Sequence, residues 1–219
     1  MSLDLRFFMT MLVLFPAIAG AFRFFKADKR FRPFIYMMWL ELATELVSYY
    51  SKKFPMNFNL HTATLPIYYL IYFYLFLELA RHFKFVTRNK REILLISALI
   101  LAFIKLIPGP IFTKYDYLQF FVSIVQLIIS IEILANQVLN LKQKWNSNFW
   151  VWMSSASIFY NTIILLVFTL HSFAFPHYKS LGYLNTIINV FYFLGAGIAI
   201  LKIPEGKNRY SDQSIIPNL

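Results

Sequence analysis

The sequence predicts an all-α protein, a bundle of seven transmembrane helices, on three observations. The 219 residues are 59% hydrophobic and only 14% charged, which leaves more apolar surface than a soluble domain of this size can hide. Seven apolar stretches follow one another along the chain. The Lys and Arg residues lie mostly in the short loops between them. That placement is the membrane-topology pattern, so the net charge of +11 does not indicate a nucleic-acid partner.

The predicted membrane-spanning helices are, in order, 7–25, 34–50, 65–83, 93–107, 117–139, 148–170 and 181–201. The first of them also fits a signal peptide, because Ala17, Ile18 and Ala19 resemble a small-residue cleavage site. We favour its retention, since cleavage would strand the basic cluster of residues 23–32 in a free external N-terminus. Residues 1–203 then form one membrane domain, and residues 204–219 form a polar cytoplasmic tail.

The basic residues also predict the orientation. Of the 21 Lys and Arg residues, 15 fall on the side of the bundle that holds loops 23–32 and 81–91, Lys142 and Lys144, and the C-terminus. By the positive-inside rule, the N-terminus is outside and the C-terminus is cytoplasmic. The expected location is the cytoplasmic (inner) membrane of a bacterium.

An internal repeat is the next prediction. A shift of 115 residues places 7–25 on 117–139, and FIYMM from Phe34 on FWVWM from Phe149; a shift of 116 places LPIYYLIYFYLFL from Leu65 on LGYLNTIINVFYF from Leu181. Two parallel three-helix units joined by the fourth helix are therefore expected, related by an axis along the membrane normal. The alternative is that evenly spaced helices align without any common origin.

Two acidic residues lie in the middle of the second predicted helix. Glu41 and Glu45 are four residues apart, so they share one helix face. Carboxylates are costly in lipid and should face the protein interior or water. Because two such carboxylates repel when both are ionised, at least one should hold a proton or share a cation. The alternative is a protonated, purely structural glutamate that is hydrogen-bonded to a neighbouring helix.

Polar stripes on other helices supply the expected neighbours, since each of these side chains lies on the polar face of its own helix. The predicted pocket for a ligand or proton contains Glu41, Glu45, Tyr72, Gln126, Asn161, Asn185 and Asn189. The alternative is that the amides and hydroxyls only hold membrane helices together.

Motifs for catalysis or for cofactor binding are absent from the sequence. It has no cysteine, no His-Glu-x-x-His, no Gly-rich phosphate loop, no Gly-x-Ser-x-Gly and no Lys in 181–201 that could hold retinal. His61, Asp116, His171 and His177 all fall on the outer side and could form a metal site, but their spacing is not diagnostic, and loop histidines at the membrane interface are the preferred interpretation. We therefore predict no catalytic residue, no cofactor and no metal.

Two resemblances add to this interpretation. The segments FWVWMSSASIFYNTIILLVF from Phe149 and LNTIINVFYFLGAGIAILK from Leu184 resemble the last two helices of small, uncharacterised seven-helix membrane proteins of Bacteroidota. That family often has Asn-Ser where this chain has Ser154-Ser155, and it brings no established activity. The three-plus-one-plus-three plan also resembles the SWEET sugar exporters. Their Pro-Gln motif is absent here, and 117–139 and 148–170 contain neither Pro nor Gly.

The preferred functional hypothesis is a sensory or partner-binding module. It would read a small polar ligand, a proton or a cation at the glutamate face and signal to a membrane or cytoplasmic protein partner. Its surroundings are the lipid bilayer, with no nucleic acid. The alternative is a proton-coupled small-solute transporter with a three-plus-one-plus-three repeat, and an intramembrane enzyme is a third hypothesis. The small number of helix breakers favours the first.

Overall fold

The computed structural model describes residues 3–53, 60–106, 117–139, 148–173 and 180–206. Seven α-helices and no strand occur within these ranges, which confirms the predicted all-α class. They are α1 (Leu3–Phe24), α2 (Arg32–Lys53), α3 (Leu60–His82), α4 (Arg88–Leu106), α5 (Tyr117–Leu139), α6 (Phe149–Phe173) and α7 (Ser180–Leu201), with a short 3-10 turn η1 (Lys29–Phe31) before α2.

Most helices are longer than the apolar stretches from which they were predicted. The bounds of α5 match the predicted 117–139, whereas α2 extends the predicted 34–50 at both ends. Backbone hydrogen bonds of a helix continue through polar residues, so hydropathy marks only the apolar part of a helix. By length and apolarity together, two helical segments among the described residues could cross a membrane: α5, and residues 149–167 of α6.

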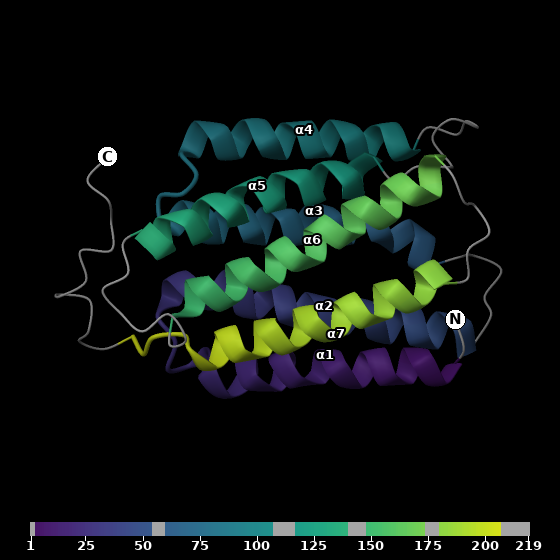
Figure 1. Ribbon diagram of the computed structural model, residues 1–219, viewed down its shortest axis with the longest axis horizontal. Helices are drawn as coiled ribbons and strands as arrows, with labels where there is room; N and C mark the ends of the chain where they lie inside the picture. The colour runs from purple at the N-terminus through teal and green to yellow at the C-terminus, as the bar shows by residue number, and fades with distance from the viewer. Residues whose placement is uncertain (1–2, 54–59, 107–116, 140–147, 174–179, 207–219) are drawn as a thin grey trace.

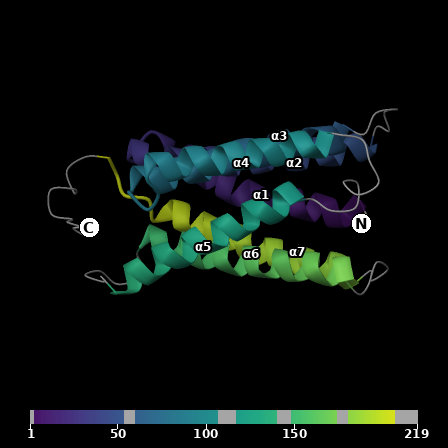
Figure 2. The ribbon, with the colours of Figure 1, turned by 90° about the horizontal axis from the view of Figure 1, so that it is seen from above.

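Successive helices run in opposite directions along the long axis of the molecule, so that α1, α3, α5 and α7 are parallel to one another (Figure 1). Six helices form a closed ring through the contacts α1–α2, α2–α3, α3–α5, α5–α6, α6–α7 and α7–α1. Helix α4 packs on α3 and α5 from outside this ring. Seen from above, α2, α3 and α4 lie on one side and α5, α6 and α7 on the other, with α1 between them (Figure 2).

The ring consists of two helix triplets, α1–α3 and α5–α7, which we call the N-terminal and C-terminal triplets. Each contact in the N-terminal triplet has an equivalent in the C-terminal one: α1–α2 corresponds to α5–α6, and α2–α3 corresponds to α6–α7. The two contacts between the triplets, α3–α5 and α7–α1, also correspond to each other. This symmetry of contacts is what a duplicated three-helix unit would produce. The duplication itself stays a prediction.

Close helix packing depends on small residues at two contacts of the ring. A Cβ atom on Gly195 of α7 would lie 2.7 Å from the Cβ of Ala156 on α6, and one on Gly197 would lie 2.1 Å from the ring of Phe15 on α1. Neither distance is sterically allowed, so glycine lets the α7 backbone approach both neighbours. In addition, the indole nitrogen of Trp39 on α2 donates to the carbonyl of Ala17 on α1 at 3.1 Å.

The segment that follows α7 pairs with the loop between α1 and α2. The amide of Asp28 donates to the Pro204 carbonyl at 3.2 Å, and the amide of Gly206 donates to the Lys26 carbonyl at 2.8 Å. The Arg23 guanidinium lies 3.1 Å from the Glu205 carboxylate. The first residues of the predicted tail are thus held against the bundle; residues 207–219 lie outside the described ranges.

The surface and the interior have an unusual distribution of polarity. Large apolar side chains face outward on every helix, as shown by Phe22 on α1, Leu46 on α2, Ile67 on α3, Ile93 on α4, Ile128 on α5, Leu166 on α6 and Phe191 on α7. Polar side chains are buried between the helices, namely Ser123, Gln126, Ser130, Gln137, Ser154, Ser157 and Asn161. Most buried side chains are apolar, as in a water-soluble bundle, so the unusual features are the buried polar side chains and the many large apolar side chains on the surface.

Candidate functional site

The two glutamates lie partly buried in the middle of α2. The hydroxyl of Tyr68 on α3 donates a hydrogen bond to a carboxylate oxygen of Glu41. Glu45, one turn further along α2, interacts electrostatically with Glu41. Helix α2 therefore presents a carboxylate toward the neighbouring helix, where a neutral hydroxyl meets it.

Four tyrosines gather around the Glu41 carboxylate. The hydroxyls of Tyr72 on α3 and Tyr192 on α7 are hydrogen-bonded to each other. The ring of Tyr160 on α6 packs on that of Tyr192, with their centroids 4.7 Å apart, and the rings of Tyr68 and Tyr72 are 5.7 Å apart. Glu41 interacts electrostatically with Tyr72, Tyr160 and Tyr192. We call these five residues the Glu41–tyrosine cluster; it joins α2 and α3 of one triplet to α6 and α7 of the other.

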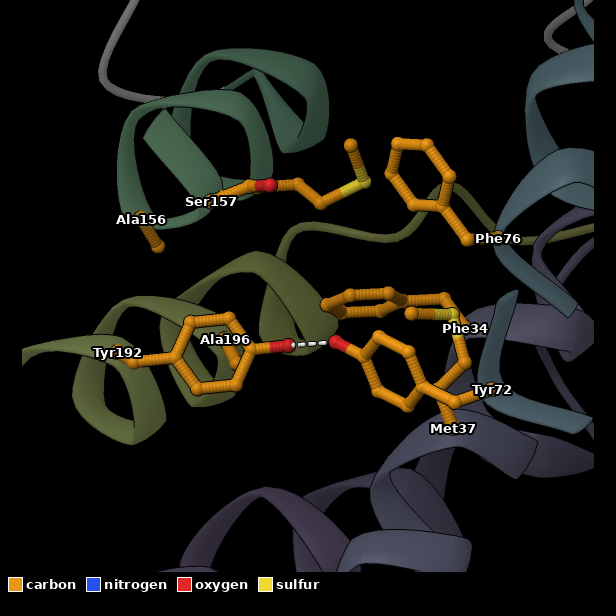
Figure 3. A pocket seen from close by; sticks show the side chains of 9 residues that line it. Phe34, Met37, Tyr72, Phe76, Ala156, Ser157, Tyr192 and Ala196 are labelled. Carbon is orange, nitrogen blue, oxygen red and sulfur yellow. Dashed lines mark hydrogen bonds between the residues drawn. The ribbon is translucent and has the colours of Figure 1, made fainter. Parts of the chain in front are cut away.

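A small cavity adjoins this cluster. Both triplets contribute to its wall, which consists of Phe34, Met37, Tyr72, Phe76, Met153, Ala156, Ser157, Tyr192 and Ala196 (Figure 3). The cavity has room for about one water molecule.

Tyr72 and Tyr192 belong both to the cavity wall and to the Glu41–tyrosine cluster. On α3, Tyr68 lies one turn before Tyr72 and contacts Glu41, whereas Phe76 lies one turn after it and lines the cavity. In Figure 3 the two tyrosine hydroxyls point toward each other across the space between the triplets. The pair therefore forms the wall that the cavity shares with the Glu41–tyrosine cluster.

The polar stripe of α5 contacts α6 along a ladder of hydrogen bonds. Ser130 donates to Ser157 at 2.9 Å, and the Asn148 amide donates to Gln137 at 2.8 Å. The Asn161 amide donates to the Ser157 carbonyl at 2.8 Å. Because the two helices are antiparallel, these residues follow one another in opposite order on α5 and α6. The ladder fastens α5 to α6 and leads to the cavity wall at Ser157.

The structure brings together part of the predicted pocket. Glu41, Glu45 and Tyr72 lie in or beside the Glu41–tyrosine cluster. Gln126 and Asn161 are buried on the facing sides of α5 and α6, and neither is hydrogen-bonded to Glu41 within the described part of the chain. Asn189 is half-buried on α7, and the side chain of Asn185 lies outside the described residues.

Three members of the cluster were not among the predicted pocket residues: Tyr68, Tyr160 and Tyr192. Tyr68 could have been predicted, because it lies four residues before Tyr72 and therefore shares its helix face. Tyr192 could also have been predicted, because it lies three residues after Asn189 on the same face of α7. Tyr160 could not, since tyrosine occurs 14 times in this sequence and most of its positions have nothing to do with the cluster.

Charged side chains concentrate at the end of the bundle where α3 ends and α4 begins. The Glu78 carboxylate forms ion pairs with Arg81 and Arg91, so α3 is linked to α4. Burial of Asp28 opposes its ionisation, but the hydrogen bonds from Arg30 outweigh this and lower the pKa of Asp28. Asp28 also caps η1 by accepting from the Arg30 amide at 2.9 Å.

No group of three His, Asp or Glu side chains among the described residues is arranged to hold a metal ion. The side chains of His61, Asp116, His171 and His177 lie outside the described residues.

The geometry of the Glu41–tyrosine cluster is suited to binding and to proton uptake, because it combines one carboxylate with neutral hydroxyl groups.

Comparisons with protein-family models, with curated proteins and with solved structures find no match for this chain. Its function is therefore inferred from its residues and their geometry.

Proposed function

We propose that this protein is a multi-pass membrane protein whose seven helices all cross the bilayer. The support is the outward-facing apolar side chains on every helix, combined with buried hydroxyl and amide groups. In water that surface would promote aggregation, whereas in lipid it is solvated and the inner polar groups bond between helices. Helix α5 and residues 149–167 of α6 also meet the length and apolarity of a membrane span.

The proposed orientation places the end that carries the α1–α2 and α3–α4 loops in the cytoplasm of a bacterium. Those two loops and their flanks contain 10 of the 21 Lys and Arg residues, and the last residues of α7 reach the same end (Figure 1). The positive-inside rule then gives an external N-terminus, a cytoplasmic C-terminus and an inner-membrane location.

Within this membrane protein, we propose that the Glu41–tyrosine cluster is a sensory site that responds to a small ligand or a proton. The observation that carries this proposal is the contact of the Glu41 carboxylate with the neutral Tyr68 hydroxyl of α3, while Tyr160 and Tyr192 of the opposite triplet interact with it electrostatically. A change in the charge at Glu41 changes its interactions with both triplets at once. That coupling can pass a signal to a membrane or cytoplasmic protein partner.

The test is the pH response of the purified protein in lipid nanodiscs. Intrinsic tyrosine and tryptophan fluorescence of the wild type should change reversibly with pH, and Glu41→Gln should abolish that change because an amide does not titrate. Glu92 is an exposed glutamate on α4 that pairs with Arg88 at the charged end of the bundle, so Glu92→Gln serves as the control and should respond like the wild type. An identical response of Glu41→Gln and the wild type would reduce Glu41 to a structural role.

A proton-coupled small-solute transporter is the second candidate. The cavity lies between two triplets whose contact pattern is symmetric on exchange, as it is in transporters built from repeated units. A transporter would carry a solute into proteoliposomes in response to a pH gradient, and Glu41→Gln would stop it. Ligand binding without any flux would favour the sensor.

A further inference from the structure

The interior of the bundle has a carboxylate but no nearby basic group among its described side chains. Glu41 lies nine residues after Arg32, about 13 Å along the axis of α2. The other described Lys and Arg side chains belong to residues 23–32, 81–91 and 202, at one end of the molecule. The hydrogen-bond partner of Glu41 is the uncharged Tyr68. A carboxylate in such a place either holds a proton or, when it is ionised, is stabilised by a cation that enters from outside.

The neighbouring cavity is lined by groups that attract organic cations. Phe34, Phe76, Tyr72 and Tyr192 contribute aromatic rings from three helices. The face of an aromatic ring carries partial negative charge and binds ammonium groups. Two methionines from opposite triplets complete the wall, and their flexible thioethers can adjust to a small guest.

The cavity and the carboxylate belong to one site. Met37, in the cavity wall, is four residues before Glu41 and therefore lies on the same face of α2. Tyr72 and Tyr192 line the cavity and also interact electrostatically with Glu41. A cation in the cavity would thus have aromatic rings around it and a carboxylate just beyond the tyrosine hydroxyls.

We propose that this cavity binds a small ammonium-type cation, either ammonium itself or a short primary amine, with Glu41 as its counter-charge. This inference rests on the proposed sensory function and names the chemical class of its ligand. The size of the cavity, which has room for about one water molecule, favours a guest with one or two heavy atoms. Ca²⁺ and Mg²⁺ are disfavoured because they require several oxygen ligands, whereas most of this wall is aromatic and aliphatic.

The experiment measures binding of methylammonium chloride to the purified protein in nanodiscs by isothermal titration calorimetry, with methanol as a neutral probe of similar size. We expect saturable binding of methylammonium, competition by ammonium, and no binding of methanol at the same concentrations. Glu41→Gln should weaken methylammonium binding at least tenfold, and Glu92→Gln should leave it unchanged. Phe76→Leu, which removes one ring while keeping an apolar side chain, should weaken binding several-fold.

The inference is overturned if the folded wild type binds neither ammonium nor methylammonium, or if Glu41→Gln binds them as well as the wild type does. If Glu41→Gln does not yield monodisperse protein, Phe76→Leu decides: unchanged affinity in that variant overturns the assignment of the cavity. The proposed sensory function fails separately. If the pH response depends on Glu41 but no amine binds, only the proposed ligand class is wrong. If neither a Glu41-dependent pH response nor amine binding is observed, both proposals are wrong.

Discussion

The hydroxyl groups of Tyr72 on α3 and Tyr192 on α7 hydrogen-bond to each other in the interior of the bundle, and so tie the N-terminal triplet to the C-terminal triplet. Both residues are buried, with 8% and 5% of their surface exposed. A buried hydroxyl that loses its partner is costly, so this contact should be visible in stability measurements.

We predict that Tyr72→Phe and Tyr192→Phe each lower the free energy of unfolding by about 1–3 kcal/mol, because each leaves the other hydroxyl without its partner. The double variant should cost less than the sum of the two single variants. Thermal unfolding in detergent, analysed as a double-mutant cycle, measures the coupling. Strict additivity of the two changes would show that the two hydroxyls do not interact.

The polar ladder between α5 and α6 allows a matched comparison. Ser130→Ala should destabilise the protein by about 0.5–1.5 kcal/mol, because Ser157 loses a hydrogen-bond donor. Gln126→Leu should be neutral or stabilising, because the amide nitrogen of Gln126 is buried without a hydrogen-bond partner among the described residues. Unfolding of both variants under identical conditions checks the order of their stabilities. A large loss for Gln126→Leu would reveal a partner such as an ordered water.

Helix packing at Gly195 should not tolerate a side chain. Gly195→Val inserts atoms where the Cβ of Ala156 already lies, and we expect a loss of about 1–3 kcal/mol from overpacking. The measurement is the melting temperature in detergent. Combining it with Ala156→Gly should recover part of the loss, and a complete absence of recovery would mean that the strain lies elsewhere.

A pH dependence is expected at Asp28. Its folded pKa lies below the ordinary value of 3.8, so ionised Asp28 stabilises the fold above about pH 4, and that contribution disappears as the pH falls through the lowered folded value. Asn keeps the capping acceptor but not the charge. Asp28→Asn should therefore cost up to about 1 kcal/mol at pH 7, and this difference should shrink in acid. Denaturant unfolding at pH 7 and pH 3 tests this; a difference that grows in acid would contradict the sign.

Membrane orientation is tested by reporter fusions at Met1 and Leu219. If all seven helices cross the membrane, the two ends of the chain are on opposite sides, and the positive-inside rule predicts that Leu219 is cytoplasmic. A fluorescent reporter at Leu219 and a periplasmic enzyme reporter at Met1 should both be active. Activity of both fusions on one side would mean that at least one helix does not cross the membrane.

The sequence allowed prediction of the features that repeat along one helix. The bounds of α5 and the polar stripe through Gln126 and Ser130 follow from hydropathy and periodicity, because burial of one face repeats every three to four residues. Contacts between helices distant in sequence were harder to foresee. The position of Tyr160 beside Glu41 depends on how the ring closes, and the pairing of Ala27 with Glu205 uses backbone atoms that leave no trace in side-chain pattern.

The backbone pairing after α7 makes one end of the bundle a clasp. Residues 26–28 belong to the N-terminal triplet and residues 204–206 follow the C-terminal one, so the clasp joins the two halves where the charged loops gather. If the two triplets move relative to each other while these hydrogen bonds stay intact, they rotate about this point. Helix α7 has 22 residues and is about 33 Å long. A tilt of α7 by a few degrees at the clasp therefore displaces the opposite end of α7 by roughly 2–3 Å. The two triplets would separate most at the end of the bundle that is farthest from the clasp.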